Sequence, residues 1–342
     1  MSEIVEIDGT IGGGSVLRLG IPLAIALGKS LRVTNVRQVR ERRKGLQVQH
    51  LTGLNFLSQL TGSQLLGASI GSSEIYLTPG INSPPMDVLP KIQIPTAAAV
   101  SLIVQVLSNF VFASRKPLAF EFEGGGTHVA HSPNFDILMK VNKPLFELFG
   151  LRMHIQLRKP GFYPKGGARG RVLFEPVPFT KTILRTDDVK EIEVISSASA
   201  SLRSQRTAER LISGFKTIIS PNKAFTGYAE SDDPGYTCSA IIRYGGNSLK
   251  GLACVGSQSS TPEDIGKETA YMVKRELKNN ATVDEQLADQ LILPLALAPR
   301  GSSYTFDKLY EHVETNLKVI KHLMGDVLDL KEEEKVYRLT KT

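Results

Sequence analysis

A glycine-rich segment near the N-terminus has residue types that can hold an anion. The segment, Asp8-Gly-Thr-Ile-Gly-Gly-Gly-Ser-Val-Leu-Arg18, follows a short predicted strand and opens a predicted helix near Val16. Glycines let backbone N–H groups approach a phosphate, and a helix N-terminus favours negative charge. The spacing matches neither standard nucleotide-binding loop, so a tight structural turn and an anion cradle both stay open. Arg18 could hold a phosphate through bidentate contacts.

A basic run follows the next predicted strand. Five of the eight residues from Arg37 to Lys44 are cationic, Arg40 and Arg43 among them. A solvated loop and a phosphate-binding loop both remain possible. Gln49 and His50 stand at the start of the following predicted helix, which favours contact with a ligand.

Two more glycine-rich loops occur further along the chain. In Glu123–Asn134, His128 and His131 are three residues apart, a spacing that a metal could use. Because no cysteine or further histidine lies nearby, we expect this loop to pack on a site instead. In Gly161–Gly167 we expect Lys165 to be exposed between proline and glycine.

Polar residues within apolar helical patterns are further candidates. Asp289 and Gln290 lie within the apolar segment Gln286–Ala296. Buried polar groups must be hydrogen-bonded or functional, and both roles stay open. His312 precedes the last predicted amphipathic helix, and a lone histidine is more often structural. The sequence contains no H-E-x-x-H motif and no evident Cys–His nucleophile pair.

Composition limits the class of protein. The 342 residues correspond to about two domains. With 41% hydrophobic and 22% charged residues, the chain is neither disordered nor fibrous. A net charge of +7 suits a nucleic-acid or nucleotide partner. The longest apolar stretches, 96–107 and 291–298, are shorter than the about 20 residues that span a bilayer. Since Met1–Asp8 does not resemble a signal peptide, we expect a cytoplasmic protein without a membrane partner. We also expect its two cysteines, Cys238 and Cys254, to be buried and reduced.

One pattern recurs along the chain: a helix-length apolar segment, then glycine or a polar turn, then an alternating β-type run. The fold class this predicts is α/β (α+β), a large domain of repeated helix-on-sheet units. Residues 184–279 differ, since they predict strand, helix, three strands and helix. We therefore expect a large discontinuous domain, 1–183 and 280–342, with a small α/β domain, 184–279, inserted into it. The units are carried by Leu17–Val36, His50–Leu77, Ala98–Phe122, Phe135–Leu157 and Asn316–Leu339.

Taken as a set, the candidate residues resemble the RNA 3′-terminal phosphate cyclase family. The matching stretches occur in family order and span nearly the whole chain. Gly161-Phe-Tyr-Pro-Lys-Gly-Gly167 and Leu287-Ala-Asp-Gln290 are specific, whereas the first glycine cluster alone is not. The other matches are Ile7–Gly9 with Gly12–Arg18, Gly45-Leu-x-x-Gln-His-Leu51, Gly125–Thr127 with Ser132, Pro133 and Asp136, and His312-x-x-Thr-Asn316.

The resemblance implies a fold and an activity. The inserted domain would have a thioredoxin-like topology. The activity would be the ATP-dependent conversion of an RNA 3′-terminal phosphate to a 2′,3′-cyclic phosphate. It would pass through a covalent His–AMP intermediate and an RNA(3′)pp(5′)A intermediate. The partners would be ATP, a divalent cation (Mg²⁺ or Mn²⁺) and RNA with a 3′-phosphate, and the chain could form a homodimer.

The resemblance also implies roles for particular residues. His312 matches the nucleophile. Gln105 and the segment Gln286, Leu287, Ala288, Asp289 and Gln290 match the nucleotide pocket, and Asp289 could orient the imidazole or help to position a metal. The residues that match the phosphate- and RNA-binding lining are Arg18, Arg40, Arg43, Gln49 and His50.

The sequence departs from the family pattern in three places. The first loop is shorter and lacks the metal-associated glutamate, His128 replaces an aspartate or asparagine, and the third loop ends in Ala168 instead of glycine. The metal ligands therefore stay unassigned. The alternative is a cyclase-like RNA-processing or ribosome-assembly factor without catalysis, which the retained His312 motif disfavours. A carboxyvinyl transferase with related repeats would give no joint role to Leu287–Gln290 and His312.

Overall fold

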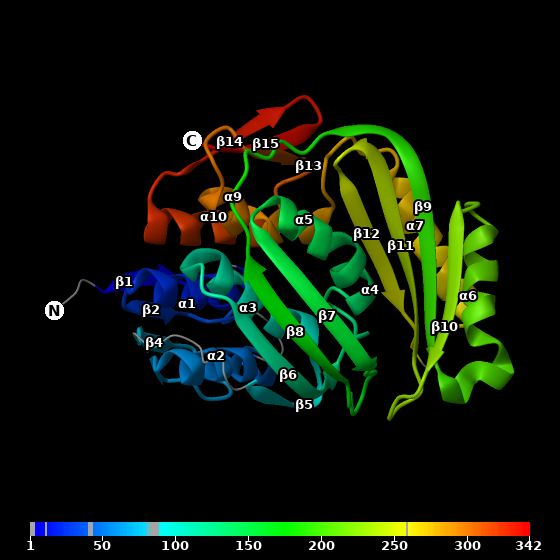
Figure 1. The fold of residues 1–342 in the computed structure, drawn as a ribbon, viewed down its shortest axis with the longest axis horizontal. Helices are drawn as coiled ribbons and strands as arrows, with labels where there is room; N and C mark the ends of the chain where they lie inside the picture. Colours follow the sequence, from blue (N-terminus) through cyan, green and yellow to red (C-terminus); the bar gives the residue numbers. More distant parts are fainter. Residues whose placement is uncertain (1–3, 11, 40–43, 81, 83–88, 258) are drawn as a thin grey trace.

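The computed structural model describes residues 4–10, 12–39, 44–80, 82, 89–257 and 259–342 (Figure 1). Its described residues form four sheets with helices packed on them, which confirms the predicted α/β architecture. Arg40 and Arg43 lie outside the described residues. No helix in the described ranges is both long and apolar enough to cross a membrane.

The first sheet positions the glycine-rich loop and the helix that follows it. Its strands run in the order β1 (Val5–Asp8), β2 (Leu31–Thr34), β4 (Ile75–Thr78) and β3 (Gln64–Leu66). Helix α1 (Ser15–Leu27) follows β1, and α2 (Val48–Thr61) follows the basic run. Each helix ends at a glycine with a left-handed backbone, Gly28 and Gly62, as the sequence pattern predicts for helix C-termini.

The second sheet carries the other two glycine-rich loops. Its order is β5 (Lys91–Ala99), β6 (Leu118–Gly126), β8 (Arg169–Pro176) and β7 (Leu151–Lys159). Helix α3 (Val100–Ser114) joins β5 to β6 and packs against α1 and α2. Buried Leu17, Ile21, Val104 and Leu107 belong to one core that these helices share. The units thus pack on one another and do not form separate modules.

The helical segment predicted over Phe135–Phe149 contains a change of helix type. It consists of α4 (Phe135–Ile137), a π-helical turn (Leu138–Asn142) and α5 (Lys143–Leu148). Pro144 stands in the first turn of α5, where it has no N–H to donate to the preceding turn. The chain therefore stays helical from Phe135 to Leu148, as the sequence predicts, with a π-helical turn inside the segment.

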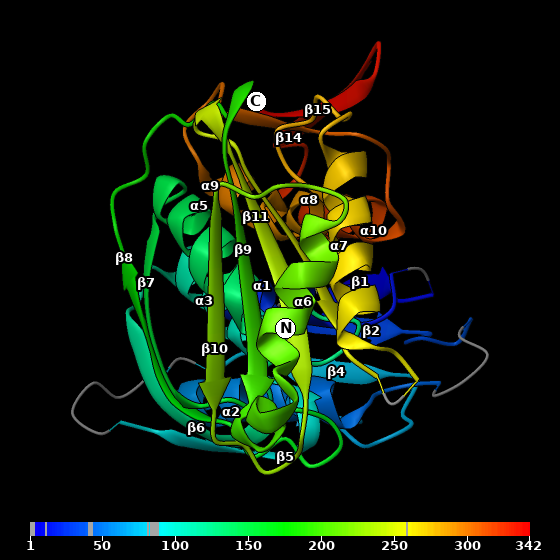
Figure 2. The same ribbon diagram turned by 90° about the vertical axis from the view of Figure 1, so that its right-hand side faces the viewer.

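Residues 184–279 form a sheet of their own and enclose a separate buried cluster, while Leu184 and Ile241 belong to the larger core. The sheet order is β10 (Lys223–Ala229), β9 (Thr186–Ser199), β11 (Tyr236–Gly246) and β12 (Leu249–Val255). A 3₁₀ turn (Ala200–Gln205), α6 (Thr207–Lys216) and α7 (Pro262–Glu276) complete the segment. The two helices cover the outer face of the sheet (Figure 2). Val194, Phe215 and Val273 belong to a buried cluster separate from the larger core.

The chain then returns to the large core. Helices α8 (Glu285–Gln290) and α9 (Ile292–Leu297) precede β13 (Ser303–Phe306) and α10 (Glu311–Met324). Strands β14 (Leu328–Glu333) and β15 (Val336–Lys341) follow, in a sheet of order β13-β15-β14. His312 lies in the first turn of α10. The expectation that His312 precedes the last helix was wrong, because α10 begins at Glu311.

Candidate active site

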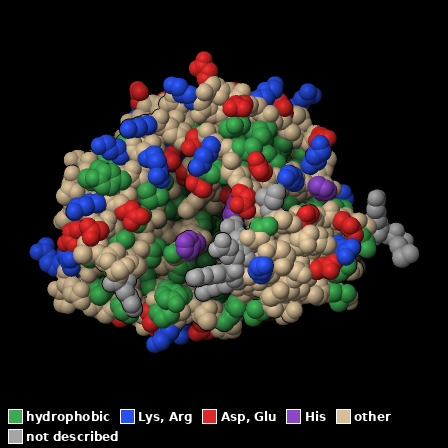
Figure 3. Space-filling model, turned by 180° about the vertical axis from the view of Figure 1, so that it is seen from behind, with side chains coloured by type: hydrophobic (Ala, Val, Ile, Leu, Met, Phe, Trp, Pro, Cys, Tyr) green, Lys and Arg blue, Asp and Glu red, His purple; other side chains and the backbone are tan. Residues whose placement is uncertain are grey.

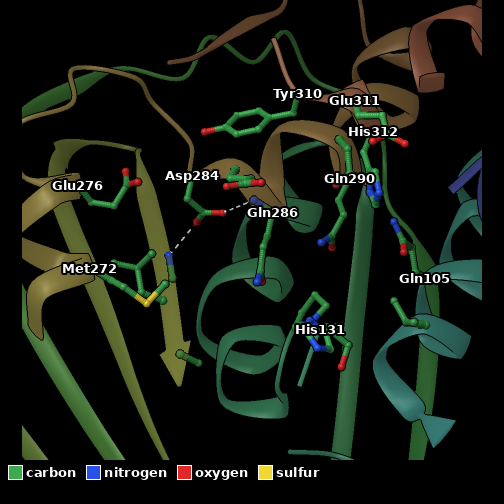
Figure 4. A pocket seen from close by; sticks show the side chains of 18 of the residues that line it. Gln105, His131, Met272, Glu276, Asp284, Gln286, Gln290, Tyr310, Glu311 and His312 are labelled. Carbon is green, nitrogen blue, oxygen red and sulfur yellow. Dashed lines mark hydrogen bonds and ion pairs between the residues drawn. The ribbon is translucent and has the colours of Figure 1, made fainter. Parts of the chain in front are cut away.

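A cleft of about 550 Å³ lies where α1, α3, α8 and α10 meet β12 and α7 (Figure 4). His312 and Asp289 line the cleft from one side, and Met272 and Arg275 of α7 line it from the other. Seen from behind, the molecule is hollowed near its middle, with histidine and acidic side chains around the hollow (Figure 3). Segments far apart in the sequence thus share one solvent-accessible site.

His312 and Asp289 face each other at the wall of the cleft. Nδ1 of His312 lies 3.6 Å from Oδ2 of Asp289, and the carboxylate is almost buried whereas the imidazole is 43% exposed. This separation is too long for a hydrogen bond, but it is an ion-pair distance when the ring is protonated. Because Asp289 faces Nδ1, Nε2 is the ring nitrogen left to meet a ligand.

The residues after His312 hold the glycine loop and α8 against α10. Thr315 packs on Gly12: a Cβ added to Gly12, whose φ is +82°, would lie 2.2 Å from the Thr315 hydroxyl. Nδ2 of Asn316 donates to the backbone oxygen of Asp289 at 3.2 Å. The His-x-x-Thr-Asn spacing places these three side chains on one helix face. The motif therefore packs the glycine loop and α8 against the helix turn that carries the imidazole.

A single carboxylate fixes the start of α8. Oδ1 of Asp284 accepts the N–H groups of Gln286 and Leu287 at 2.9 and 3.0 Å, a helix N-cap contact. Oδ2 accepts the N–H of Gly251 in β12 at 2.8 Å. Burial raises the pKa of Asp284 to about 6. Asp284 thus connects the helix that carries Asp289 to the sheet of residues 184–279.

Arg18 supplies a buried cation beside the cleft. Its Nε donates to Oε1 of Gln105 at 2.7 Å, and its backbone oxygen accepts from Asn109 at 2.9 Å. Burial lowers the pKa of Arg18, and Asp289 opposes this shift. A guanidinium remains charged in proteins, so Arg18 offers fixed positive charge where Gln105 and His312 face the cleft.

His50 is a neutral hydrogen-bond donor next to Arg18. Burial, Arg18 and Arg37 lower the pKa of His50 to about 3. The backbone N–H of Gln47 donates to Nδ1 of His50 at 3.1 Å, so the neutral ring carries its proton on Nε2. A Cβ at Gly14 would lie 2.3 Å from this Nε2 and 2.8 Å from Nη1 of Arg18. The glycine loop therefore meets two N–H donors at close range.

A carboxylate also contacts the glycine loop. Oε1 of Glu311 accepts the N–H of Gly12 at 2.9 Å, and Glu311 lines the cleft beside His312. Within the described part of the chain, no group of three or more histidine, cysteine and carboxylate side chains could hold a metal.

The predicted site residues fall into three groups. Arg18, Gln105, Gln286, Asp289, Gln290 and His312 line the cleft. Leu287 and Ala288 face the core and are fully buried, so their side chains hold α8 in place and do not line the cleft. Gln49 and His50 lie in the first turn of α2, and His50 lies next to Gly14 of the glycine loop.

Sequence reasoning missed several residues of the site. Asp284 and Glu311 were not singled out, nor were Tyr310 and the cleft residues of α7. The signal for Asp284 is an aspartate directly before a helix that carries glutamate in its first turn. No sequence pattern identifies the α7 residues as part of the cleft, because their position depends on how the two cores pack.

The two histidines of the second glycine-rich loop differ in their surroundings. His131 lines the cleft, whereas His128 is buried and stacks on Phe162 at 5.5 Å between ring centroids. Its Nδ1 lies 2.9 Å from the hydroxyl of Thr127. These contacts agree with the interpretation that this loop packs on a site.

Comparisons with known proteins identify the family. The sequence model of the RNA 3′-terminal phosphate cyclase family matches residues 10–330. Among the relatives named RNA 3′-terminal phosphate cyclase, three illustrate the similarity. The protein of Pyrobaculum aerophilum is 31% identical over 333 residues, covering 94% of this chain and 92% of the relative. That of Thermococcus onnurineus is 31% identical, covering 97% of both chains, and that of Ectopseudomonas mendocina is 28% identical, covering 98% of both. The chain therefore belongs to the RNA 3′-terminal phosphate cyclase family, a family of enzymes.

The contact of Gly14 with His50 and Arg18 gives a first prediction. Gly14 has φ −86° and ψ −9°, which alanine adopts freely, so Gly14→Ala acts only through its added methyl group. We expect the methyl group to displace His50 and Arg18 and to weaken binding of inorganic triphosphate at least about tenfold, the loss of one charged hydrogen bond. Calorimetric titration measures the affinity. Gly20→Ala is the control, because a Cβ added at this buried position of α1 would make only van der Waals contacts, 3.5 Å from Leu31 and 3.6 Å from Val319. It should bind like the wild type; equal binding by Gly14→Ala would contradict the prediction.

The buried Asp284 gives a prediction about stability. Folding raises its pKa from 3.8 to about 6, so the folded chain binds this proton more tightly than the unfolded chain. Stability relative to Asp284→Asn, which cannot titrate, should therefore rise as pH falls from 7 to 4, by about 2–3 kcal/mol at most. Thermal unfolding of both proteins across this range measures the difference. A difference that stays constant with pH would show that Asp284 does not titrate in this window.

Proposed function

We propose that this chain converts an RNA 3′-terminal phosphate to a 2′,3′-cyclic phosphate with ATP, and that His312 is its nucleophile. The observation that carries the proposal is the placement of His312. It stands in the first turn of α10, with Asp289 on its Nδ1 and the rest of its ring facing the cleft. A 14-residue helix such as α10 places partial positive charge at this end, where a polyphosphate would lie.

In the first step, Nε2 of His312 attacks the α-phosphorus of ATP. A phosphorus–nitrogen bond forms, the bond to the bridging oxygen breaks, and pyrophosphate leaves with the electron pair. The ring then carries positive charge, with its remaining proton on Nδ1. The carboxylate of Asp289, 3.6 Å away, stabilises that charge. Nucleophilic catalysis of this kind divides one difficult displacement into easier ones.

In the following steps the AMP moves to the RNA. An oxygen of the 3′-phosphate attacks the phosphorus of His–AMP, the bond to nitrogen breaks, and neutral His312 is restored. The ribose 2′-OH then attacks the RNA phosphorus, loses its proton, and AMP leaves. Arg18, Gln105 and the Nε2–H of His50 supply the donors for the developing negative charge, a contribution worth a few kcal/mol for each well-placed donor.

The donor set of the cleft fits a divalent cation. Asp289 and Glu311 flank His312, and Mg²⁺ usually binds one or two carboxylates together with phosphate oxygens and water. The cation, Mg²⁺ or Mn²⁺, would neutralise charge on the triphosphate. The first loop lacks the glutamate implied by the resemblance, but Glu311 places a carboxylate against the same loop.

We further propose that residues 184–279 form an inserted domain of thioredoxin-like topology within a large domain of residues 1–183 and 280–342. Its separate buried cluster supports this division. Its strand order, β10-β9-β11-β12, with β10 parallel and β11 antiparallel to β9, supports the topology. Asp284, just past the boundary, connects the two parts.

Incubation with α-³²P-ATP and Mg²⁺ or Mn²⁺, followed by denaturing electrophoresis, tests the nucleophile. The wild type should carry an acid-labile, alkali-stable label, as a phosphoramidate does, and His312→Ala should lose it by at least about 1,000-fold. His322→Ala, on an exposed part of the same helix, is the matched control and should label fully. A labelled His312→Ala would move the nucleophile elsewhere. Folded wild-type protein without any label would favour a non-catalytic member of the family.

The role of Asp289 is tested separately. Asp289→Asn removes the negative charge from the Nδ1 side of His312 and keeps the size of the side chain. We expect the rate of self-labelling to fall about 10- to 1,000-fold, with the KM for ATP changed much less, because the charge on the ring develops during the reaction. Single-turnover labelling over a range of ATP concentrations separates the two effects. A change in KM alone would show that Asp289 only binds the nucleotide.

A further inference from the structure

Helix α7 presents two different rows of side chains along the cleft. Glu268, Met272 and Arg275, spaced by four and three residues, line cavities. The adjacent row consists of Lys267, Tyr271, Lys274 and Lys278, which share one face by the same helical spacing. The turn continues past the end of α7, since the N–H of Lys278 donates to the oxygen of Arg275 at 3.1 Å. We call this second row the α7 ridge.

The ridge is exposed and its positive charge is largely unpaired. Tyr271 is 57% exposed, and Lys274 and Lys278 are exposed as well. Among the described residues, Lys274 and Lys278 have no carboxylate within ion-pair distance, and Lys267 has only Asp264 at 3.8 Å. Glu276, the acid nearest in sequence to Lys274 and Lys278, is buried and paired with Lys250 at 3.2 Å. The charge of the ridge is therefore available to an external anion.

The ridge is continuous with the active-site cleft. Arg275, next to Lys274, lines the cleft that contains His312. A second cavity of about 250 Å³ extends along α7 and shares His131, Met272 and Gln286 with the cleft. Lysine and arginine side chains border the hollow seen in Figure 3. A chain that leaves the cleft on this side meets the ridge directly.

Cations in the last turn of a helix also complement the helix dipole, so charge alone does not define a binding surface. The ridge differs from an ordinary helix end in two respects. It carries an exposed aromatic ring between its lysines, and it borders the cleft in which the 3′ end must react. Positive side chains that follow the backbone, with an aromatic ring on which a base stacks, are typical of single-strand binding.

We propose that the α7 ridge binds the single-stranded RNA immediately 5′ of the reacting phosphate. Lys274 and Lys278 contact backbone phosphates, and Tyr271 stacks on a base. The inserted segment thereby serves to hold the body of the RNA while the large core carries the reacting groups. This inference rests on the proposed function for the identity of the substrate, but RNA binding is measurable without turnover.

The first experiment measures the affinity for a ten-nucleotide single-stranded RNA with a 3′-phosphate as a function of salt. Lys274→Gln/Lys278→Gln should bind at least about fivefold more weakly at 0.1 M salt. The slope of log affinity against log salt should fall by about 1.4, the loss of two phosphate contacts to a single strand. Lys216→Gln/Lys335→Gln removes the same charge from exposed positions that line no described cavity and should bind like the wild type.

A second experiment separates the ridge from a general effect of charge. A dinucleotide with a 3′-phosphate is too short to fill the cleft and also follow the ridge. The KM of Lys274→Gln/Lys278→Gln should therefore rise for the ten-nucleotide RNA and stay at the wild-type value for the dinucleotide. Tyr271→Ala should weaken binding of the longer RNA on the order of tenfold, whereas Tyr271→Phe keeps the stacking surface and should bind normally.

The outcomes distinguish this inference from the proposed function. Self-labelling with ATP should be unchanged in the ridge variants, since the ridge side chains do not line the cleft. Absence of labelling in the wild type would contradict the proposed function and leave the RNA-binding result to be judged on its own. Wild-type RNA affinity and salt slope in Lys274→Gln/Lys278→Gln would overturn the inference. An equal loss in the control double variant would do the same.

Discussion

The carboxylate of Asp284 is the contact on which the geometry of the site depends. Both of its oxygens accept backbone N–H groups, two at the start of α8 and one in β12. A neutral amide of the same shape has a single acceptor oxygen and cannot satisfy both directions. Because α8 carries Asp289, whose Oδ2 lies 3.6 Å from Nδ1 of His312, the contacts of Asp284 help to place the carboxylate that faces the imidazole. The large core and the segment 184–279 are thereby coupled at the residue where the chain passes from one to the other.

Near that contact, one side chain of the site supplies positive charge and another supplies a neutral hydrogen-bond donor. Arg18 supplies permanent positive charge, while His50 is kept neutral by its burial and by Arg18 and Arg37. A protonated His50 beside Arg18 would add like-charge repulsion in the ligand-free protein. The neutral ring instead offers one directed donor on Nε2. Glycine at position 14 lets these two groups approach the loop, so the glycines serve close approach as much as backbone conformation.

Local sequence signals predicted much of this structure. Glycine after an apolar run correctly marked the ends of α1 and α2, because a left-handed C-cap is a local property of the chain. The His-x-x-Thr-Asn and Leu-Ala-Asp-Gln segments fall on α10 and α8, which line one cleft. The contacts of Asp284 with β12 and of Glu311 with Gly12 could not be predicted, since each joins residues separated by 33 or 299 positions. Such contacts depend on how units pack, which periodicity does not encode.

The central claim is that His312 becomes covalently bonded to AMP through Nε2. Its most direct test is peptide mapping by mass spectrometry of the full-length chain after incubation with ATP and Mg²⁺, under alkaline conditions that preserve a phosphoramidate. The account predicts one AMP adduct, located on His312, that disappears when RNA with a 3′-phosphate is added. An adduct on a lysine, on His131 or on His50 would contradict the assignment. An adduct on His312 that persists with RNA would contradict its place in the transfer.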